Sequence, residues 1–358
     1  MRVTHVLGGV PGVLTEGEVA RSGAYLADLQ LPSGLIPWYV GGHSDPWNHV
    51  ECAMALTITG HHDGALAAYD WLRRHQLGDG SWFNYYVGER VRDARLDTNV
   101  CAYVAAGVHH YVTATGDADV AARLWPMLER AIDFVLRHQR DDGAISWSLD
   151  AKGRVESYSL LTGSSSIFHS LRCAVALAER LDHHRPAWEL AAGRLGHALA
   201  HHPEAFAPKD EFAMDWYYPV LAGVVMGERA LARLDARWAD FVMDDRWVRC
   251  VSTNDWVTAA ETAEAVLSLD AVGRGARALE LLAQTSRHRL ADGSYLTGIV
   301  YPDRVTFPHA ETSSYTAAAV LLAVDALTDA TPAAGLFRHG TLSDTLDWPE
   351  AHCALVTR

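Results

Sequence analysis

The sequence has no long apolar run and no cluster of basic residues, and these absences exclude several classes of protein. Its longest apolar stretches, such as residues 317–324, are far shorter than the roughly 20 residues that a membrane-spanning helix needs. The formal net charge is −14, and Lys and Arg form no run. This argues against nucleic acid or an anionic membrane surface as the main partner. No apolar run follows Met1, so no signal peptide is expected.

Cysteine is also scarce, and its spacing excludes a disulfide framework. None of the cysteines forms a C-x-x-C pair, and four of them fall in or beside apolar helical patterns. The sequence contains no P-loop, no G-x-G-x-x-G after a strand, no H-E-x-x-H and no G-x-S-x-G. We therefore expect a cytoplasmic protein without a cofactor, acting on a small-molecule substrate. The cysteines are Cys52, Cys101, Cys173, Cys250 and Cys353.

What the chain does contain is an internal repeat. Its clearest copy is residues 71–82, where a helix ends in Gln76 and three residues separate this Gln from Gly80, which precedes an aromatic. The frame recurs at residues 29–34 and 137–147, and with Arg in place of Gln at 289–295. Each copy is followed by a polar loop and an apolar, Ala-rich helix. A repeat of this kind indicates a modular architecture.

Two kinds of helix alternate along the chain, six of each. Amphipathic helices suit an outer ring with one wet face, and helices that are apolar all round suit a covered inner ring. The amphipathic segments are 16–29, 64–76, 118–139, 188–202, 228–242 and 273–289, and the apolar ones are 48–59, 98–114, 165–181, 216–226, 255–269 and 313–327. The prediction is an all-α (α/α)6 barrel, a toroid without a sheet of consequence. Residues 1–330 would form one domain, and residues 331–358 a tail that packs on the barrel.

The repeated Gln has a mechanical interpretation. It stands at a helix C-terminus, where the last carbonyl groups lack partners, and its side-chain amide can donate to them. Arg289 can do the same with added charge. Gly supplies the left-handed residue that ends the turn, and the aromatic packs the loop against the next unit. The turn is therefore expected to be structural.

The stretch Trp71-Leu-x3-Gln76-x3-Gly80-x-Trp82 resembles the QW repeat of squalene cyclases and class II terpene cyclases, shared more loosely with prenyltransferase β-subunits. The resemblance implies an α/α toroid in which an Asp acid protonates an isoprenoid and aromatic faces stabilise the cation. Arg95-Leu96-Asp97-Thr98 is the nearest match to the acid motif, with Arg95 where the family's helper Asp would stand. The zinc ligands of prenyltransferases have no close match beyond Asp97, Cys101 and His309, so no metal is expected.

In such a barrel the loops from outer to inner helices meet on one face, and their residues line a common pocket. Polar and aromatic side chains are frequent at these positions. They are His43, Asp45, Trp47, Asn48, His49 and Glu51; Trp82, Tyr85, Tyr86, Arg95, Asp97 and Asn99; Tyr158, Ser164, Ser165, Ser166 and His169; Asp215, Trp216, Tyr217 and Tyr218; Asn254, Asp255, Trp256 and Glu261; and Tyr301, His309, Glu311, Thr312 and Tyr315.

Taken singly, the acidic residues at helix starts are explained by N-capping. Taken together, carboxylates or imidazoles at the same point of five units exceed what capping requires, and they favour acid–base catalysis. The catalytic candidates are Asp97, Asp215, Glu51, Asp255, His309 and Glu311, with Asp97 or Asp215 as the acid. The substrate-binding candidates are Trp47, His49, Trp82, Tyr86, Trp216, Tyr217, Trp256 and Tyr315.

Three functions are compatible with these residues. The resemblance favours a terpene cyclase or prenyltransferase-like enzyme that uses Asp acid catalysis on an isoprenoid. The alternative is a carbohydrate-active enzyme, such as a glycoside hydrolase, epimerase or lyase, in which two carboxylates face each other across a cleft and aromatics stack on sugar rings. A third possibility is a non-catalytic toroidal binding protein.

Overall fold

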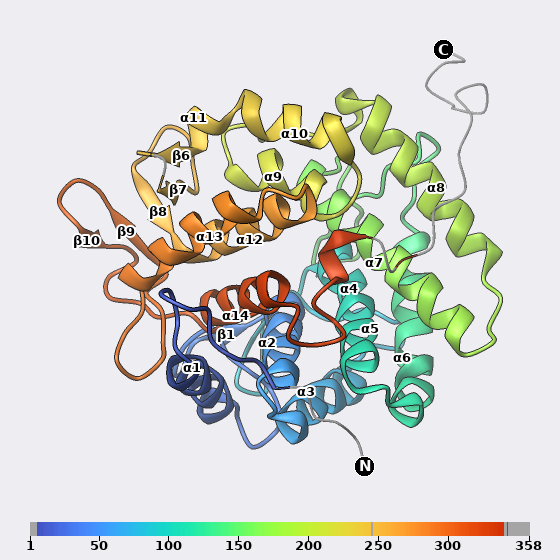
Figure 1. Cartoon of the computed structure of the whole chain (residues 1–358). Helices are drawn as coiled ribbons and strands as arrows, with labels where there is room; N and C mark the ends of the chain where they lie inside the picture. Colours follow the sequence, from blue (N-terminus) through green and yellow to red (C-terminus); the bar gives the residue numbers. More distant parts are fainter. Residues whose placement is uncertain (1–5, 245, 340–341, 343–358) are drawn as a thin grey trace.

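The computed structural model describes residues 6–244, 246–339 and 342, and its central feature is a closed ring of inner helices (Figure 1). Each inner helix packs on the next, and the last packs on the first, which closes the ring. In ring order the inner helices are α2 (Pro46–Ile58), α4 (Thr98–Ala102) with α5 (Val104–Thr115), α7 (Leu161–Arg180), α9 (Ala213–Leu221), α12 (Ala259–Ala271) and α14 (Ser314–Thr328). The predicted (α/α)6 barrel is therefore confirmed.

A second set of helices surrounds this ring and presents one polar face to solvent. The two sets differ because an inner helix is covered on every side, so that α14 buries all but a few of its residues, whereas an outer helix such as α13 buries only Ala278, Leu281 and Leu282. The outer helices are α1 (Glu16–Leu29), α3 (His62–His75), α6 (Ala118–Leu136), α8 (Pro186–His201), α10 (Gly227–Ala236) with the short α11 (Trp238–Phe241), and α13 (Gly275–Gln284).

Short antiparallel strands tie the loops together, where the sequence predicted no sheet of consequence. The strands pair in the orders β1–β2–β3, β10–β9–β8, β4–β5 and β6–β7, and none exceeds four residues in the described part of the chain. They are β1 (His43–Ser44), β2 (Tyr85–Val87), β3 (Arg90–Asp93), β4 (Leu96–Asp97), β5 (Ser148–Leu149), β6 (Val242–Met243), β7 (Trp247–Val248), β8 (Trp256–Thr258), β9 (Gly298–Val300) and β10 (Val305–Thr306). Several of them brace the loops that lead into inner helices.

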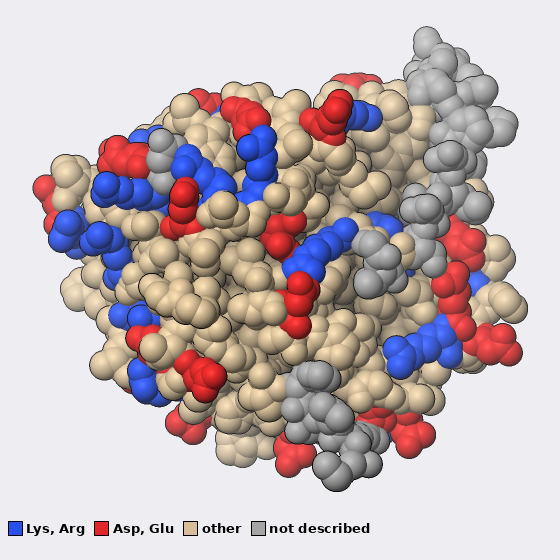
Figure 2. Space-filling model, viewed as in Figure 1, with Lys and Arg blue, Asp and Glu red and all other residues tan. Residues whose placement is uncertain are grey.

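The hydrophobic core is continuous around the ring and reaches the start of the C-terminal segment. Leu336 and Phe337, in the 3-10 helix η3 (Leu336–Arg338), are buried in this core, as is Leu342. Of the tail predicted at 331–358, residues 340, 341 and 343–358 lie outside the described residues. Figure 2 shows acidic and basic side chains interspersed over one face of the molecule. Among the described residues, no helix combines the length and the apolar character that crossing a membrane requires.

The repeated Gln joins successive helix pairs rather than capping its own helix. The side-chain amide of Gln76 donates to the carbonyl of Gly80 in its own turn at 2.9 Å and to that of Met127, in the outer helix α6, at 2.8 Å. The other two turns repeat both bonds, from Gln30 to Gly34 and Gly64 and from Gln139 to Gly143 and Ala191. The predicted partner of the Gln amide was wrong, whereas the structural role of the turn follows directly from these bonds.

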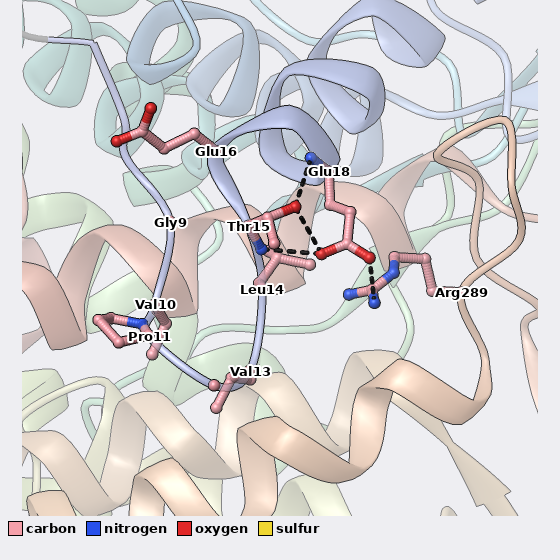
Figure 3. Close-up of a pocket in the computed structure, with 10 residues that line it drawn as sticks. Gly9, Val10, Pro11, Val13, Leu14, Thr15, Glu16, Glu18 and Arg289 are labelled. Carbon is pink, nitrogen blue, oxygen red and sulfur yellow. Dashed lines mark hydrogen bonds and ion pairs between the residues drawn. The ribbon is translucent and has the colours of Figure 1, made fainter.

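An ion pair and a capping box replace the Gln bond where the sixth unit meets the first. Arg289 donates to the Glu18 carboxylate of α1 at 2.6 Å, and Glu18 also accepts from the backbone N–H of Thr15 at 2.8 Å (Figure 3). The Ser22 hydroxyl donates to the carbonyl of Gly293 at 2.8 Å. These contacts form the seam of the ring, by which we mean the junction of residues 289–293 with α1.

Replacing the glycine of a repeated turn should destabilise the barrel strongly. Gly80 has φ +97°, and a Cβ placed on it would lie 2.2 Å from the carbonyl oxygen of Arg130 in α6. We expect Gly80→Ala to lower the free energy of unfolding by about 3 kcal/mol or more, because left-handed strain of about 1–3 kcal/mol adds to the clash. Urea denaturation measures the effect. The control is Gly78→Ala in the same turn, where no atom lies within 4 Å of the added Cβ and the change should stay within about 0.5 kcal/mol. Equal losses in the two variants would contradict the proposed close contact.

Candidate active site

A cavity of about 530 Å³ lies at the end of the barrel where the inner helices begin. Five of the six units contribute to its wall, and most contributions come from the first turn of an inner helix or the loop before it. The lining residues are Trp38, Asp45, Trp47, Asn48, Asn84, Tyr85, Arg95, Asp97, Asn99, Val100, Trp147, Leu160, Thr162, Gly163, Lys209, Phe212, Met214, Asp215, Cys250 and Glu261. Its size and mixed lining are those of a small-molecule site.

Four carboxylates line this cavity, each from a different inner helix. Asp45 and Asp97 are the N-caps of α2 and α4, and Asp215 and Glu261 stand in the first turns of α9 and α12. In the ring order, α2 lies opposite α9, and the α4–α5 pair lies opposite α12. Asp45 and Asp215 therefore face each other across the ring, as do Asp97 and Glu261. The N-termini of these helices also point their positive dipole ends toward the cavity, which stabilises negative charge.

Asp97 and Asp45 are held firmly by hydrogen bonds on one side of the cavity. Asp97 Oδ1 accepts from the backbone N–H groups of Asn99 at 2.9 Å and Val100 at 3.1 Å. Asp45 accepts from the Trp38 indole at 2.7 Å and from both nitrogens of Asn48. Burial raises the pKa of Asp97 to about 6, its backbone hydrogen bonds oppose this rise, and the negative charge of Asp45 adds to it. Burial likewise raises the pKa of Asp45.

The opposite side of the cavity carries Asp215 and Glu261. Asp215 Oδ1 accepts from the Thr162 hydroxyl at 2.5 Å and from its backbone N–H at 3.3 Å, which ties the starts of α9 and α7 together. Burial raises the pKa of Asp215. Glu261 lies beside the Cys250 thiol, whose pKa is raised by burial and by the Glu261 charge. The side chain of Glu261 is longer than those of the three aspartates.

Aromatic and amide side chains complete the wall. Trp38, Trp47, Tyr85, Trp147 and Phe212 present ring faces or edges to the cavity. Asn48, Asn84 and Asn99 add amide groups that can both donate and accept hydrogen bonds. A cavity with several ring platforms, neutral hydrogen-bonding groups and facing carboxylates is suited to a polyhydroxylated ring substrate and to acid–base chemistry on it.

Of the residues predicted as catalytic or substrate-binding, Asp97, Asp215 and Trp47 line the cavity. Residues that were expected only in the pocket wall line it as well, namely Asp45, Asn48, Tyr85, Arg95, Asn99 and Glu261. Glu51 and Tyr217 instead lie deeper, in the buried centre of the ring. Glu51 accepts from Tyr103, and the Tyr217 hydroxyl donates to Glu264, one helical turn beyond Glu261. Burial and the negative charge of Glu264 raise the pKa of Glu51.

Four further predicted binding residues are occupied by structural contacts. His49 accepts from the backbone of Ile36, Trp82 donates to Leu72, Tyr86 accepts from Phe83, and Trp216 donates to Leu234. All four are buried. They do not contact the cavity, because their side chains point between inner and outer helices.

The remaining predicted residues lie in the segments before α12 and α14 or in the first turn of α14, and none of them lines the cavity. Asp255 pairs with Arg249 at 3.0 Å, Trp256 donates to Phe307, Glu311 accepts from Thr297, and His309 is exposed. Tyr315 packs edge-on against Trp38, 4.8 Å between ring centroids, and so supports the wall from behind. Within the described ranges, no three His, Cys, Asp or Glu side chains gather as a metal site would require.

Asp45 and Glu261 were expected in the pocket wall but were not among the predicted catalytic residues. A signal for Asp45 was present, since Asp followed by Pro46 at the first helical position marks a helix start. Glu261 stands three residues after Thr258, the residue that precedes α12. Trp147 lies next to β5, and only the pairing of β5 with β4 brings it to Asp97.

Comparison with known proteins finds a relative in sequence and several solved structures of similar fold. The chain is 50% identical over 349 residues, 98% of this chain and 96% of the relative, to the MMP endo-(1,4)-3-O-methyl-alpha-D-mannosidase of Mycolicibacterium hassiacum. A wild-type glycosidase structure superimposes with a TM-score of 0.69 at 15% identity, covering 88% of this chain and 97% of that one. D-mannose isomerase gives 0.63 at 11%, covering 86% and 96%. No protein-family model matches.

These findings overturn the resemblance to squalene and terpene cyclases and to prenyltransferases, and with it the predicted isoprenoid substrate. The physical reason lies in the repeated turn. Its Gln bridges two backbone carbonyls of neighbouring units and does not line the cavity, so the turn indicates how helix pairs join and carries no information about the reaction. The carbohydrate alternative fits the relatives better.

Proposed function

Because this chain belongs to the family of the Mycolicibacterium hassiacum MMP endo-(1,4)-3-O-methyl-alpha-D-mannosidase, we propose that it is a glycoside hydrolase. Its substrate would be a chain of (1,4)-linked 3-O-methyl-α-D-mannose units, cut at internal linkages. The observation that carries this proposal is the pairing of carboxylates across one aromatic-walled cavity. Glycoside hydrolysis requires one carboxyl group that protonates the leaving oxygen and a second that acts as base or nucleophile.

Asp97 is our candidate for the general acid. An acid must hold its proton at working pH, and the pKa of Asp97 is raised to about 6 by burial. The negative charge of Asp45 on the neighbouring helix favours the protonated form further. The two backbone N–H groups that bind Oδ1 fix the carboxyl in position while the proton is transferred.

Glu261 is our candidate for the second carboxylate. It comes from α12, opposite the α4–α5 pair, so a sugar bound between the two walls would have one carboxyl on each side. Either it would attack the anomeric carbon directly, or it would deprotonate a water that attacks there. Asp215 accepts two hydrogen bonds from Thr162 and so joins α9 to α7. We therefore assign it a role in holding these two helices together and not in the chemistry.

The aromatic groups and amides suit the proposed substrate in complementary ways. Trp47 and Trp147 offer ring faces to the C–H face of a pyranose, and Asn48 and Asn84 offer hydrogen bonds to its hydroxyl groups. A 3-O-methyl group removes one hydroxyl donor and adds apolar surface. Leu160 and Met214, in the same wall, provide apolar contacts for it.

The experiment that tests the function is incubation with defined (1,4)-α-mannosides, with and without 3-O-methyl groups, and product analysis by mass spectrometry. We expect internal cleavage of the methylated oligomer and little or no cleavage of the unmethylated one. An NMR spectrum recorded during the reaction shows whether the new anomeric centre is retained or inverted, and so whether Glu261 attacks or activates water. Absence of cleavage of every mannoside would reject the proposal.

The cysteines bear on where the enzyme works. Cys52, Cys101 and Cys173 are buried free thiols, and Cys250 is a partly buried free thiol in the cavity wall. Free thiols of this kind persist in a reducing compartment. We therefore propose the cytoplasm as the site of action, which fractionation of cells that produce the protein would test.

A further inference from the structure

A second hollow, of about 600 Å³, lies on the outside of the barrel against α9. Its walls come from the end of the outer helix α8, from residues 203 and 210 after it, and from one face of the next outer helix, α10. We call it the side groove. It is lined by Leu161, Leu199, Ala200, Pro203, Asp210, Asp215, Trp216, Val225, Arg229, Ala232, Arg233, Ala236 and Arg237.

The side groove adjoins the catalytic cavity along a shared wall. Asp215 lines both hollows. Leu161 lines the groove, whereas its chain neighbours Leu160 and Thr162 line the cavity. Asp210 in the groove likewise follows Lys209 in the cavity. The two hollows therefore adjoin along the same three backbone segments.

Arg233 of α10 and Arg237, which directly follows α10, fix the walls of the groove. The Arg233 guanidinium donates to the backbone carbonyls of Trp216 at 2.8 Å and Asp215 at 2.5 Å. Arg237 donates to the carbonyl of Asp210 at 2.5 Å. These bonds join α10 to the start of α9 and to the loop before it, so the groove is a defined feature of the fold.

Arginine guanidinium groups and alanine methyl groups alternate on the face of α10 that lines the groove. Arg229, Ala232, Arg233, Ala236 and Arg237 recur at the spacing of one helical face. Ala232 and Ala236 are exposed, so the floor they form is shallow and open. Leu199 and Val225 extend the apolar surface on the other wall.

We propose that the side groove binds the part of an O-methylated glycan chain that extends beyond the scissile linkage. This inference rests on the proposed function, since an enzyme that cuts internal linkages must hold sugar units on both sides of the cleavage point. A methyl ether oxygen accepts hydrogen bonds and cannot donate them, so it matches guanidinium donors. Its methyl group matches the Ala and Leu surface between them.

Filling the groove with a large side chain tests the proposal. Ala232→Trp should lower kcat/KM for a long 3-O-methylated (1,4)-α-mannoside about tenfold, roughly the effect of one or two lost hydrogen bonds with their apolar contacts. The shortest oligomer that the enzyme cleaves should be hydrolysed as before, because it need not leave the cavity. Isothermal titration of the long oligomer should show a parallel loss of affinity, and this readout does not depend on turnover.

The matched control is Ala276→Trp. Ala276 is exposed in a hollow of about 380 Å³ on the α13 side of α10, and this hollow shares no lining residue with the catalytic cavity. It should leave both substrates unaffected. Equal losses on long and short oligomers in Ala232→Trp, or unchanged kinetics and affinity for the long one, would overturn the inference. The parent protein could bind the long oligomer, and lose affinity in Ala232→Trp, yet hydrolyse no mannoside. That result would support the groove as a glycan-binding site and reject the hydrolase proposal.

Discussion

Asp97→Asn is expected to lower kcat for hydrolysis by about 10³ or more while the barrel stays folded, within the range typical for removing a general acid. Asn is as good an N-cap as Asp, so its side-chain oxygen can still accept from Asn99 and Val100 at the start of α4. A lower kcat in this variant would therefore result from the missing acidic proton and not from a changed start of α4. Steady-state kinetics measure kcat, and thermal unfolding verifies that stability is unchanged within about 1 kcal/mol.

The variant Asp45→Asn distinguishes the role of Asp45 from that of Asp97, which lies on the same side of the cavity. Because Asp97 acts in its protonated form, activity should fall as pH rises through its pKa of about 6. The Asp45 charge raises that pKa, so removing it should shift the fall in activity to lower pH. A pH–rate profile that does not move would contradict the coupling. A loss of about 10³ in Asp45→Asn together with an active Asp97→Asn would instead assign the acid to Asp45.

Glu261→Gln carries the second large expected effect, a loss of about 10³ or more in kcat, because Gln can neither attack the anomeric carbon nor take a proton from water. The matched control is Glu264→Gln, one turn further along α12, where the side chain accepts from Tyr217 in the buried centre of the ring. Gln still accepts this bond, so hydrolysis should persist. Comparable losses in the two variants would mean that Glu261 acts through the packing of α12.

The double variant Asp97→Asn with Glu261→Gln sharpens this test. Two groups that act in one step lose little more together than the worse of the two alone, because either change already removes the chemistry. We expect the double variant to be no more than about tenfold slower than the slower single variant. Fully multiplicative losses would place Asp97 and Glu261 in separate steps.

The fold could be predicted because two simple patterns determine it. Apolar residues on all faces distinguish inner helices such as α14, and a Gln followed four residues later by a left-handed Gly marks the end of outer helices such as α3. Helix ends were less predictable. Tyr103 interrupts the predicted helix 98–114, and residues 256–258 pair as strand β8 instead of starting α12, because tertiary pairing competes with local helix formation.

The site could be predicted only in part, because position in a first turn does not determine side-chain direction. Asp215 and Trp216 are adjacent, yet successive helical residues diverge by about 100°, so Asp215 meets the cavity and Trp216 packs toward Phe241. Trp47 and His49, two residues apart in α2, diverge by about 200° and so point to nearly opposite faces of the helix. Glu51 is one turn deeper than Trp47, which places its carboxyl beside Tyr103 in the core.

The seam between Arg289 and Glu18 has a consequence for how the protein folds. Its partners are 271 residues apart, whereas the Gln bonds of the earlier turns span about fifty residues or fewer. Contacts of such long range are slow to form, because the intervening chain must be ordered first. During synthesis, helix α1 therefore has no partner at the seam until the last unit leaves the ribosome, and ring closure becomes the final, cooperative event of folding.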